Sequence, residues 1–378
     1  MELLKKETDN SDVEKLAKLN ASLVKIRNKE SKMLFCITES QNPVASIYEI
    51  YFQATTLKKA GYDVTIITEK DDYLIPNWIE RELTDFTHVS MNKINMPIGP
   101  EDVLIVPEVF TNVMEQTKDL PCIRITLLQS IDYLVNSLLV GMDLFNFEVQ
   151  NILTTSNTLK NLYEEFYGKN RYNIKKYNIG IPDYFTKQEK PQKPIVSIIG
   201  RNNNEITKIV KLFYAKYPQY SWINFDTMIT QSKPPMPLNR IDFAERLKGN
   251  FAAVWVDRIS SFGTFPLECM KSGVIPIAVK PDLTPEYLIE TDENGDIKYK
   301  NNSGVWTTDI YAIPILLGDI ITKFLDDSIG TAVYEKMDEI VSEYTPEISA
   351  SQILVAYESF LNERAEIFEK IITDSTKK

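Results

Sequence analysis

Short apolar runs alternate with helical segments along this chain, and this order restricts the possible fold more than any other feature. In the first half, residues 33–38 predict a strand, 47–60 a helix closed by Gly61, and 64–68 a second strand. A strand, a helix and a strand in this order make a βαβ unit, whose strands are parallel. Further apolar runs follow at 103–106, 122–127 and 152–155. We therefore predict a doubly wound α/β domain in this half.

A polar stretch at 187–194, interrupted twice by proline, separates these runs from a second set. Such a composition is typical of an interdomain linker. The second set predicts another parallel sheet, with strands at 195–200, 222–225, 252–256 and 274–279. Asn294-Gly295 predicts the turn of a short hairpin after them.

With 378 residues, the chain is long enough for two such domains. Two sheets of this kind imply a cleft between them, because their ligands bind beyond the carboxyl ends of the strands. The predicted parts are a helical N-terminal extension at 1–32, a Rossmann-like domain at 33–185, a second Rossmann-like domain at 186–350 and a C-terminal helix at 351–378.

The segment 260–276 combines a tight turn with a short helix that carries one carboxylate, Glu268. A carboxylate about one turn into a helix can accept hydrogen bonds from a ribose diol, while free N–H groups at the helix start attract phosphates. This layout predicts a nucleotide-sugar pocket; a solvated helical glutamate is the alternative for Glu268. The backbone groups expected to contact phosphate belong to Gly263, Thr264 and Phe265.

This segment resembles the signature of retaining nucleotide-sugar glycosyltransferases of the GT-B fold, in which two glutamates separated by seven residues bracket a Phe-Gly turn. Glu268 matches the second glutamate, and Ser260 stands at the position of the first. Ser260 and the neighbouring Ser261 are expected either to bind the donor or to cap the helix. The segments at 42–46, 57–64 and 177–185 are similar to other parts of the family's pattern, so the resemblance covers most of the chain.

The resemblance implies a GT-B architecture, with two Rossmann-like doubly wound domains facing across a cleft, and a last helix that crosses back to the first domain. It also implies transfer of a hexosyl or pentosyl group from a nucleotide-diphospho-sugar, bound as substrate, to an acceptor hydroxyl. Retention of anomeric configuration and independence from metals and other cofactors are expected. The acceptor classes that stay open are a glycan, a lipid-linked sugar, a protein and a modified DNA base.

Gly200 and Arg201 follow an apolar strand and resemble the family's Gly-Arg turn, whose arginine and a following lysine bind the donor diphosphate. Cations aimed at the leaving diphosphate lower the barrier, because negative charge grows there as the glycosidic bond breaks. Lys208 is the best match for the lysine, and Lys211 is the alternative. For Arg201 the alternative is an ordinary exposed arginine at a strand end.

An acceptor hydroxyl that needs a base could lose its proton to a carboxylate of the first domain. Glu39 and Glu108 both follow apolar strands, and Glu108 is the better placed. A glutamate at such a position also often accepts hydrogen bonds from a helix N-terminus, which is the alternative role.

Several other kinds of site are disfavoured. The chain has only one histidine, His88, which argues against a histidine-dependent triad or metal site, and we expect it in a loop or edge strand. The acidic pairs Asp71-Asp72 and Asp326-Asp327 are interpreted as solvated caps. Neither a Gly-x-Gly-x-x-Gly nor a Gly-Lys-Ser/Thr phosphate loop occurs, which disfavours dehydrogenase and kinase functions.

The formal net charge of −11 gives no long-range attraction for nucleic acid. One local basic cluster keeps a DNA-base glycosyltransferase as an alternative; it comprises Lys169, Arg171, Lys175 and Lys176. A nucleotide-sugar-binding protein without transfer activity is the other alternative, because Ser260 replaces a glutamate.

The cysteines Cys36, Cys122 and Cys269 are widely spaced and odd in number, so we expect buried free thiols and a reducing compartment. No apolar run approaches the roughly 18 residues of a membrane span, and the N-terminus lacks a signal-peptide core. We therefore expect a cytoplasmic protein without integral membrane association.

Overall fold

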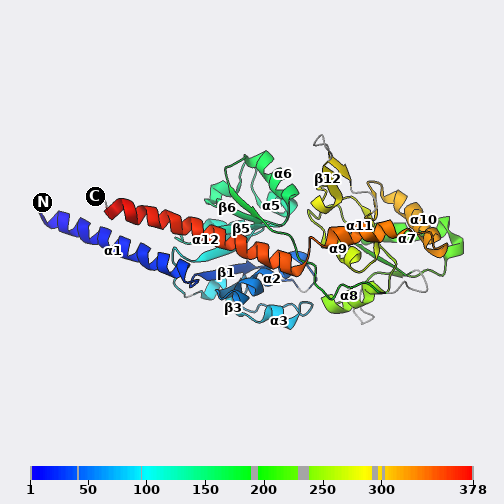
Figure 1. Ribbon diagram of the computed structural model, residues 1–378, viewed down its shortest axis with the longest axis horizontal. Coiled ribbons are helices and arrows are strands. Elements are labelled where there is room, and N and C mark those ends of the chain that lie inside the picture. The colour runs from blue at the N-terminus through cyan, green and yellow to red at the C-terminus, as the bar shows by residue number, and fades with distance from the viewer. Residues whose placement is uncertain are drawn as a thin grey trace.

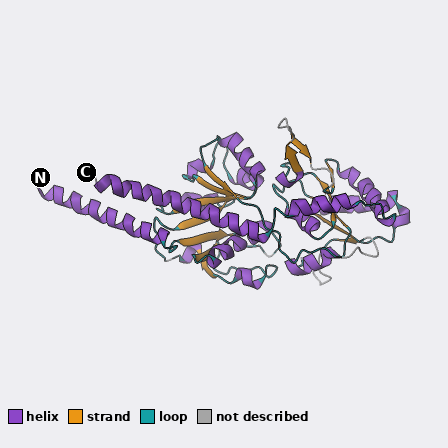
Figure 2. Ribbon diagram, in the orientation of Figure 1, coloured by secondary structure: helices purple, strands orange, loops and turns teal. Residues whose placement is uncertain are grey.

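Two parallel sheets, each with helices packed against it, form two α/β domains that lie end to end (Figure 1). The computed structural model describes residues 2–40, 42–94, 96–188, 195–228, 238–291, 297–299 and 303–376. Figure 2 shows the strands of both sheets at the centre of their domains and the helices outside them. Among the described residues, no helix has both the length and the apolar character that a membrane crossing requires.

The first domain is built on seven parallel strands in the order β3-β2-β1-β4-β5-β6-β7. The strand order reverses between β1 and β4, which is the doubly wound arrangement. Its strands are β1 (Lys32–Ile37), β2 (Asp63–Thr68), β3 (Thr87–Ser90), β4 (Val103–Pro107), β5 (Ile123–Leu128), β6 (Asn151–Thr154) and β7 (Asn173–Lys176). Its helices are α2 (Ala45–Lys59), α3 (Arg81–Thr84), η1 (Met91–Lys93), α4 (Thr111–Gln116), α5 (Ile131–Ser137), η2 (Leu144–Phe147) and α6 (Asn157–Tyr167).

The second domain contains five parallel strands in the order β14-β11-β10-β8-β9, which reverses between β8 and β10. Its strands are β8 (Val196–Gly200), β9 (Phe225–Asp226), β10 (Ala252–Val256), β11 (Ile275–Val279) and β14 (Val305–Thr307). An antiparallel pair comprises β12 (Ile289–Thr291) and β13 (Ile297–Tyr299). The helices are α7 (Asn203–Lys216), η3 (Pro218–Tyr220), α8 (Arg240–Lys248), α9 (Thr264–Lys271), η4 (Glu286–Leu288), η5 (Ile310–Ala312), α10 (Ile313–Leu325) and α11 (Thr331–Val341).

The two long helices α1 (Glu2–Arg27) and α12 (Pro346–Thr376) lie side by side and extend beyond the first domain, with both chain ends at the same end of the molecule (Figure 1). α12 follows α11 of the second domain and packs against α2, β5 and β7 of the first. Two ion pairs join the end of α1 and the turn after it to α12, Arg27 with Glu369 and Lys29 with Glu358. Tyr357 of α12 lies edge-on to Phe35 of β1, with ring centroids 6.1 Å apart.

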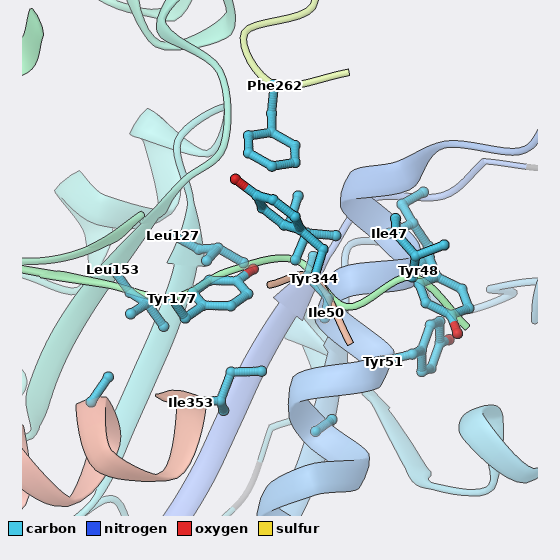
Figure 3. Close-up of a cluster of buried hydrophobic side chains, with 14 of the residues drawn as sticks. Ile47, Tyr48, Ile50, Tyr51, Leu127, Leu153, Tyr177, Phe262, Tyr344 and Ile353 are labelled. Carbon is cyan, nitrogen blue, oxygen red and sulfur yellow. The ribbon is translucent and has the colours of Figure 1, made fainter. Parts of the chain in front are cut away.

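The core at the junction of the two domains is continuous. One buried apolar cluster takes residues from α2, the first sheet, α9 and α12. Figure 3 shows Tyr177 beside Leu127 and Leu153 of the first sheet, with Ile353 of α12 below it and Phe262 above Tyr344. The chain therefore closes the two domains against each other through apolar contacts as well as polar ones.

The predicted α/β class with two parallel sheets is confirmed. Gly61 ends α2 as predicted: its φ is +96°, and Tyr62 N donates to Leu57 O at 3.1 Å, which satisfies a terminal carbonyl. The strand predicted at 222–225 is reduced to Phe225–Asp226, and the short strands β3, β7 and β14 had no prediction. Most of the expected linker and the Asn294-Gly295 turn lie outside the described residues, although strands do flank that turn.

Candidate active site

A cavity of about 390 Å³ lies between the two domains, at the carboxyl ends of strands in both sheets. The second domain contributes Gly200 and Arg201 after β8, Asp257 after β10, and the turn that starts α9. The first domain contributes the start of α2 and the start of α5. This is the strand-order reversal of the second sheet, where open α/β sheets bind ligands.

A second cavity of about 320 Å³ adjoins the first one, because both are lined by the loop 43–45 and by Ile199, Thr264 and Phe265. Its remaining walls include an ion pair, Arg240 with Glu268. The walls also include the large apolar side chains Trp78, Met228, Leu238 and Phe243. A ligand that fills both cavities would meet polar groups in the first and a more apolar wall in the second.

The turn before α9 depends on Gly263, whose φ is +70°. A Cβ atom there would lie 2.4 Å from the Trp255 ring, so no other residue fits. The hydroxyl of Tyr287 donates to the carbonyls of Phe262 and Gly263, at 3.0 and 2.7 Å, and fixes the turn from behind. Thr264 and Phe265 at the start of α9 line both cavities, and the first N–H groups of a helix have no acceptors within it.

We expect Gly263→Ala to lower the free energy of unfolding by about 3 kcal/mol, because it combines left-handed strain with a clash in the core. Urea denaturation measures the change. Gly141→Ala is the matched control: its φ is +80°, but a Cβ there has nothing within 4 Å. Equal losses in the two variants would show that Trp255 does not restrict the turn.

Arg201 lies in the first cavity and is held in a fixed orientation. Its Nε donates to Asp257 Oδ2 at 2.8 Å, its Nη1 to the Tyr133 hydroxyl at 3.1 Å, and its Nη2 to Ser260 Oγ at 3.3 Å. Hydrogen bonds from Arg201 to Asp257 and Tyr133 raise the pKa of the guanidinium against the effect of burial, so it stays cationic. The cavity therefore contains a permanent, oriented positive charge.

Ser260 and Ser261 face different partners. Ser260 Oγ donates to Asp257 Oδ2 at 2.7 Å, so the carboxylate nearest to the Ser260 position is that of Asp257. Ser261 is buried, and its Oγ accepts from Ile131 N of α5 at 3.2 Å. Neither side chain caps α9, whose N-cap residue is Gly263. Ser261 instead connects the turn to the first domain.

Glu268 lies on α9 and is buried against Arg240 of α8, whose Nη2 donates to Glu268 Oε1 at 2.7 Å. Burial raises the pKa of Glu268, and the positive charge of Arg240 opposes this shift. The guanidinium of Arg240 also lies 3.7 Å from the ring centroid of Tyr48, and its backbone N–H donates to Trp78 O of the first domain at 3.1 Å. The ion pair thus belongs to the interface between the domains.

The structure does not bring all predicted residues together. Lys208 and Lys211 are exposed on α7, and neither lines the two cavities. Glu108 is buried and also lines neither cavity; its Oε1 accepts from Ser130 N at 2.9 Å, next to the start of α5. Burial raises the pKa of Glu108 to about 7. Glu39 pairs with Lys70 at 3.1 Å.

Among the lining residues that had no prediction as site residues are Glu49, Tyr133, Arg240 and Asp257. Asp257 directly follows β10, so its strand-end position was a usable signal. The other three lie on helices, where a polar side chain is usually solvated. Only their position at the contact between the two domains distinguishes these three residues from solvated helical side chains.

Residues predicted outside the site behave largely as expected. Cys36, Cys122 and Cys269 are buried free thiols. His88 lies in the edge strand β3, where the Tyr51 hydroxyl and its Nε2 are 2.9 Å apart. Asp71 is not simply solvated, since it accepts from Ser90 Oγ and pairs with Lys93 at 3.2 Å.

The fold is similar to that of several solved structures. Sucrose-phosphate synthase from Thermosynechococcus elongatus matches with a TM-score of 0.57 and 13% identity, over 88% of this chain and 100% of that chain. A glycosyltransferase from Rickettsia africae ESF-5 matches with a TM-score of 0.58 and 12% identity, over 88% and 99%. An alpha-glucosyltransferase in complex with UDP and a 13-mer DNA containing an HMU base matches with a TM-score of 0.57 and 11% identity, over 88% and 100%.

No family model matches the chain, and no curated protein matches it either. At these identities the likeness concerns the fold. It confirms the predicted GT-B architecture, with two Rossmann-like domains. What the site does must be argued from its own residues.

Proposed function

We propose that this protein is a glycosyltransferase that moves a sugar from a nucleotide-diphospho-sugar to an acceptor hydroxyl. The observation that carries the proposal is the position of Arg201 beside the start of α9, in a cavity bounded by both domains. Oriented N–H groups and a fixed guanidinium are the groups that a diphosphate requires. The solved structures of similar fold include glycosyltransferases, which supports this proposal by analogy.

The two cavities suggest how the donor would lie. The nucleoside would occupy the second cavity, where Glu268 can accept hydrogen bonds from the ribose hydroxyls. The diphosphate would lie at Gly200, Arg201 and the turn at Gly263, and the sugar would extend into the first cavity. Closure of the two domains around the sugar would keep water from the reacting carbon.

Arg201 would stabilise the leaving diphosphate, because its positive charge persists over the physiological pH range. We propose that this charge serves in place of a metal ion. Ser260 would help through Arg201, because its Oγ accepts from the guanidinium and donates to Asp257. We propose retention of anomeric configuration from the resemblance of the 260–276 segment. The anomeric configuration of the first-formed product, determined by NMR, tests this part separately.

Donor binding and turnover test the proposal. Thermal unfolding is measured with uridine, guanosine, cytidine and adenosine diphospho-sugars, and nucleoside diphosphate release is followed with simple sugar alcohols as acceptors. A ligand present at 100 times its Kd stabilises the folded protein by about 2.7 kcal/mol. The diphospho-sugars of one nucleoside should raise the Tm of the protein, and nucleoside diphosphate should be released from them. Stabilisation without release would instead indicate a nucleotide-sugar-binding protein, and no stabilisation by any donor contradicts both.

The charges around the expected basic cluster do not favour a DNA acceptor. Arg171 pairs with Asp143 at 2.7 Å, Lys175 with Glu363 at 2.6 Å and Lys176 with Glu286 at 3.0 Å. These cations are already neutralised within the protein, so few remain for phosphates. A gel shift with duplex DNA at low salt would show no complex if this interpretation is right.

A further inference from the structure

The first domain contributes a single carboxyl group to the described lining of the interdomain cavity, that of Glu49. Glu49 lies on α2, and only 2% of its surface is exposed. It faces the same cavity as Arg201, from the opposite domain. A buried carboxyl group needs partners, and those of Glu49 define what it can offer to a ligand.

A chain of hydrogen bonds from the C-terminal helix reaches Glu49. The Tyr357 hydroxyl of α12 donates to Gln53 Oε1 at 2.7 Å, and Gln53 Nε2 donates to the Tyr177 hydroxyl at 2.9 Å. The Tyr177 hydroxyl then donates to Glu49 Oε2 at 3.3 Å. All three hydrogen bonds of this series are donated in the direction of Glu49, so Glu49 Oε2 is an acceptor. Among the described residues, Oε1 has no hydrogen-bond partner.

The surroundings keep this carboxyl group protonated. Burial raises the pKa of Glu49 to about 8, although the positive charge of Arg240 on α8 and the hydrogen bond from Tyr177 oppose the shift. Arg240 is itself paired with Glu268 of α9, whose negative charge offsets part of the effect of Arg240 on Glu49. Because Oε2 accepts from Tyr177, the proton belongs on Oε1, which is then a hydrogen-bond donor.

We propose that Glu49 is a specificity-determining residue that binds a hydroxyl group of a sugar substrate in this cavity through Oε1. The inference rests on the proposed glycosyltransferase function and adds a residue of the first domain to it. The hydroxyl group can belong to the transferred sugar or to the acceptor, since both would meet in this cavity. Gln53, Tyr177 and Tyr357 act as positioning residues behind Glu49.

Two substitutions of Glu49 test the proposal with steady-state kinetics. Glu49→Ala removes the donor, and we expect kcat/KM to fall about 10-fold, which corresponds to one lost hydrogen bond. Glu49→Gln keeps an N–H donor of similar shape, and we expect kcat/KM within about 3-fold of the wild type at about pH 6.5. Wild-type kcat/KM should decline above about pH 8 as Glu49 ionises, and this decline should be absent in Glu49→Gln.

Two controls accompany these variants. Glu82→Gln makes the same side-chain substitution at an exposed position on α3 and should leave the pH profile unchanged. Tyr177→Phe removes the last hydrogen bond of the series without altering the described cavity lining. Because that hydrogen bond lowers the pKa of Glu49, the decline in kcat/KM should move to higher pH and not disappear. Donor hydrolysis in the absence of acceptor identifies the bound hydroxyl group: a loss there indicates the donor sugar, and a raised acceptor KM alone indicates the acceptor.

Stability gives a readout that does not depend on activity. The folded protein keeps a proton on Glu49 that the unfolded chain loses above the ordinary glutamate pKa of 4.5. Wild-type stability should therefore fall, relative to Glu49→Gln, as pH rises from 4.5 to about 8, and the difference should then level off. Urea midpoints at about pH 5 and about pH 8 measure this difference. If the Ala variant does not fold, the Gln variant decides.

The possible failures are distinguishable. If the wild type neither binds nor turns over any nucleotide-sugar, the proposed function fails and this inference falls with it. If the wild type transfers sugar and both Glu49 variants match it at every pH, only the role of Glu49 is wrong.

Discussion

An Arg201→Ala variant should transfer sugar about 100- to 1,000-fold more slowly than the wild type, because one preorganised group that stabilises developing charge is lost. The guanidinium is oriented by Asp257, Tyr133 and Ser260 before any ligand binds, so little reorganisation is needed when the diphosphate leaves. The loss should appear mainly in kcat, since the charge on the diphosphate grows in the transition state. Single-turnover release of nucleoside diphosphate measures it.

Three further variants make the test specific. Arg201→Lys keeps the charge but not the planar donors that bind Asp257 and Tyr133, and it should recover only part of the rate. Arg81→Ala removes an exposed arginine of α3 and controls for net charge. Lys208→Ala tests the lysine that the resemblance predicts for the diphosphate, although Lys208 lines neither cavity. A fall in kcat as large as that of Arg201→Ala would mean that α7 moves to the donor. Wild-type kcat in Arg201→Ala would contradict the placement of the diphosphate.

The sheets could be predicted because parallel strands buried on both faces are continuous apolar runs. Strands β1, β4, β10 and β11 are fully or almost fully buried, and each was recognised within two residues. The edge strands β3 and β14 are only partly buried, so their sequences lack that signal. The last helix begins at Pro346, before the predicted start, because Thr345 accepts from Ile348 N at 3.3 Å and supports an earlier turn.

The site was only partly predictable, because motifs show which residues follow one another and not which ones meet. Gly200, Arg201 and the 260–265 turn were identified from local patterns and do line one cavity. The partners of Glu268 and Glu49 are distant in sequence: Arg240 is 28 residues from Glu268, and Tyr177 is 128 residues from Glu49. No periodicity or spacing carries that information.

Ser260 stands where the signature that this segment resembles has a glutamate, and the negative charge beside Ser260 belongs to Asp257. Asp257 Oδ1 accepts from the backbone N–H groups of Ile259 and Ser260, at 3.0 and 3.1 Å, and Oδ2 binds Arg201 and the Ser260 side chain. A carboxylate with this many donors is fully engaged. It therefore orients Arg201, and it is not free to bind a sugar hydroxyl.

A Glu268→Ala variant should have two separable defects. It leaves the guanidinium of Arg240 buried without its carboxylate, which should lower the free energy of unfolding by about 3 kcal/mol. It also removes the acceptor proposed for the ribose, which should weaken donor binding about 10-fold or more, as for a hydrogen bond to a charged group. Urea denaturation measures the first defect, and calorimetric titration at about 10 °C, near the temperature of maximum stability, measures the second.

The second defect can be isolated by removing the unpaired charge. In the double variant Arg240→Leu with Glu268→Leu neither charge of this pair remains, so much of the stability should return while donor binding stays weak. Glu245→Ala, which removes the ion pair of Glu245 with Lys248 on the exposed side of α8, is the control and should cost less than about 1 kcal/mol. If the double variant bound donor as tightly as the wild type, Glu268 would serve only to hold the domains together, and the ribose would have to lie elsewhere.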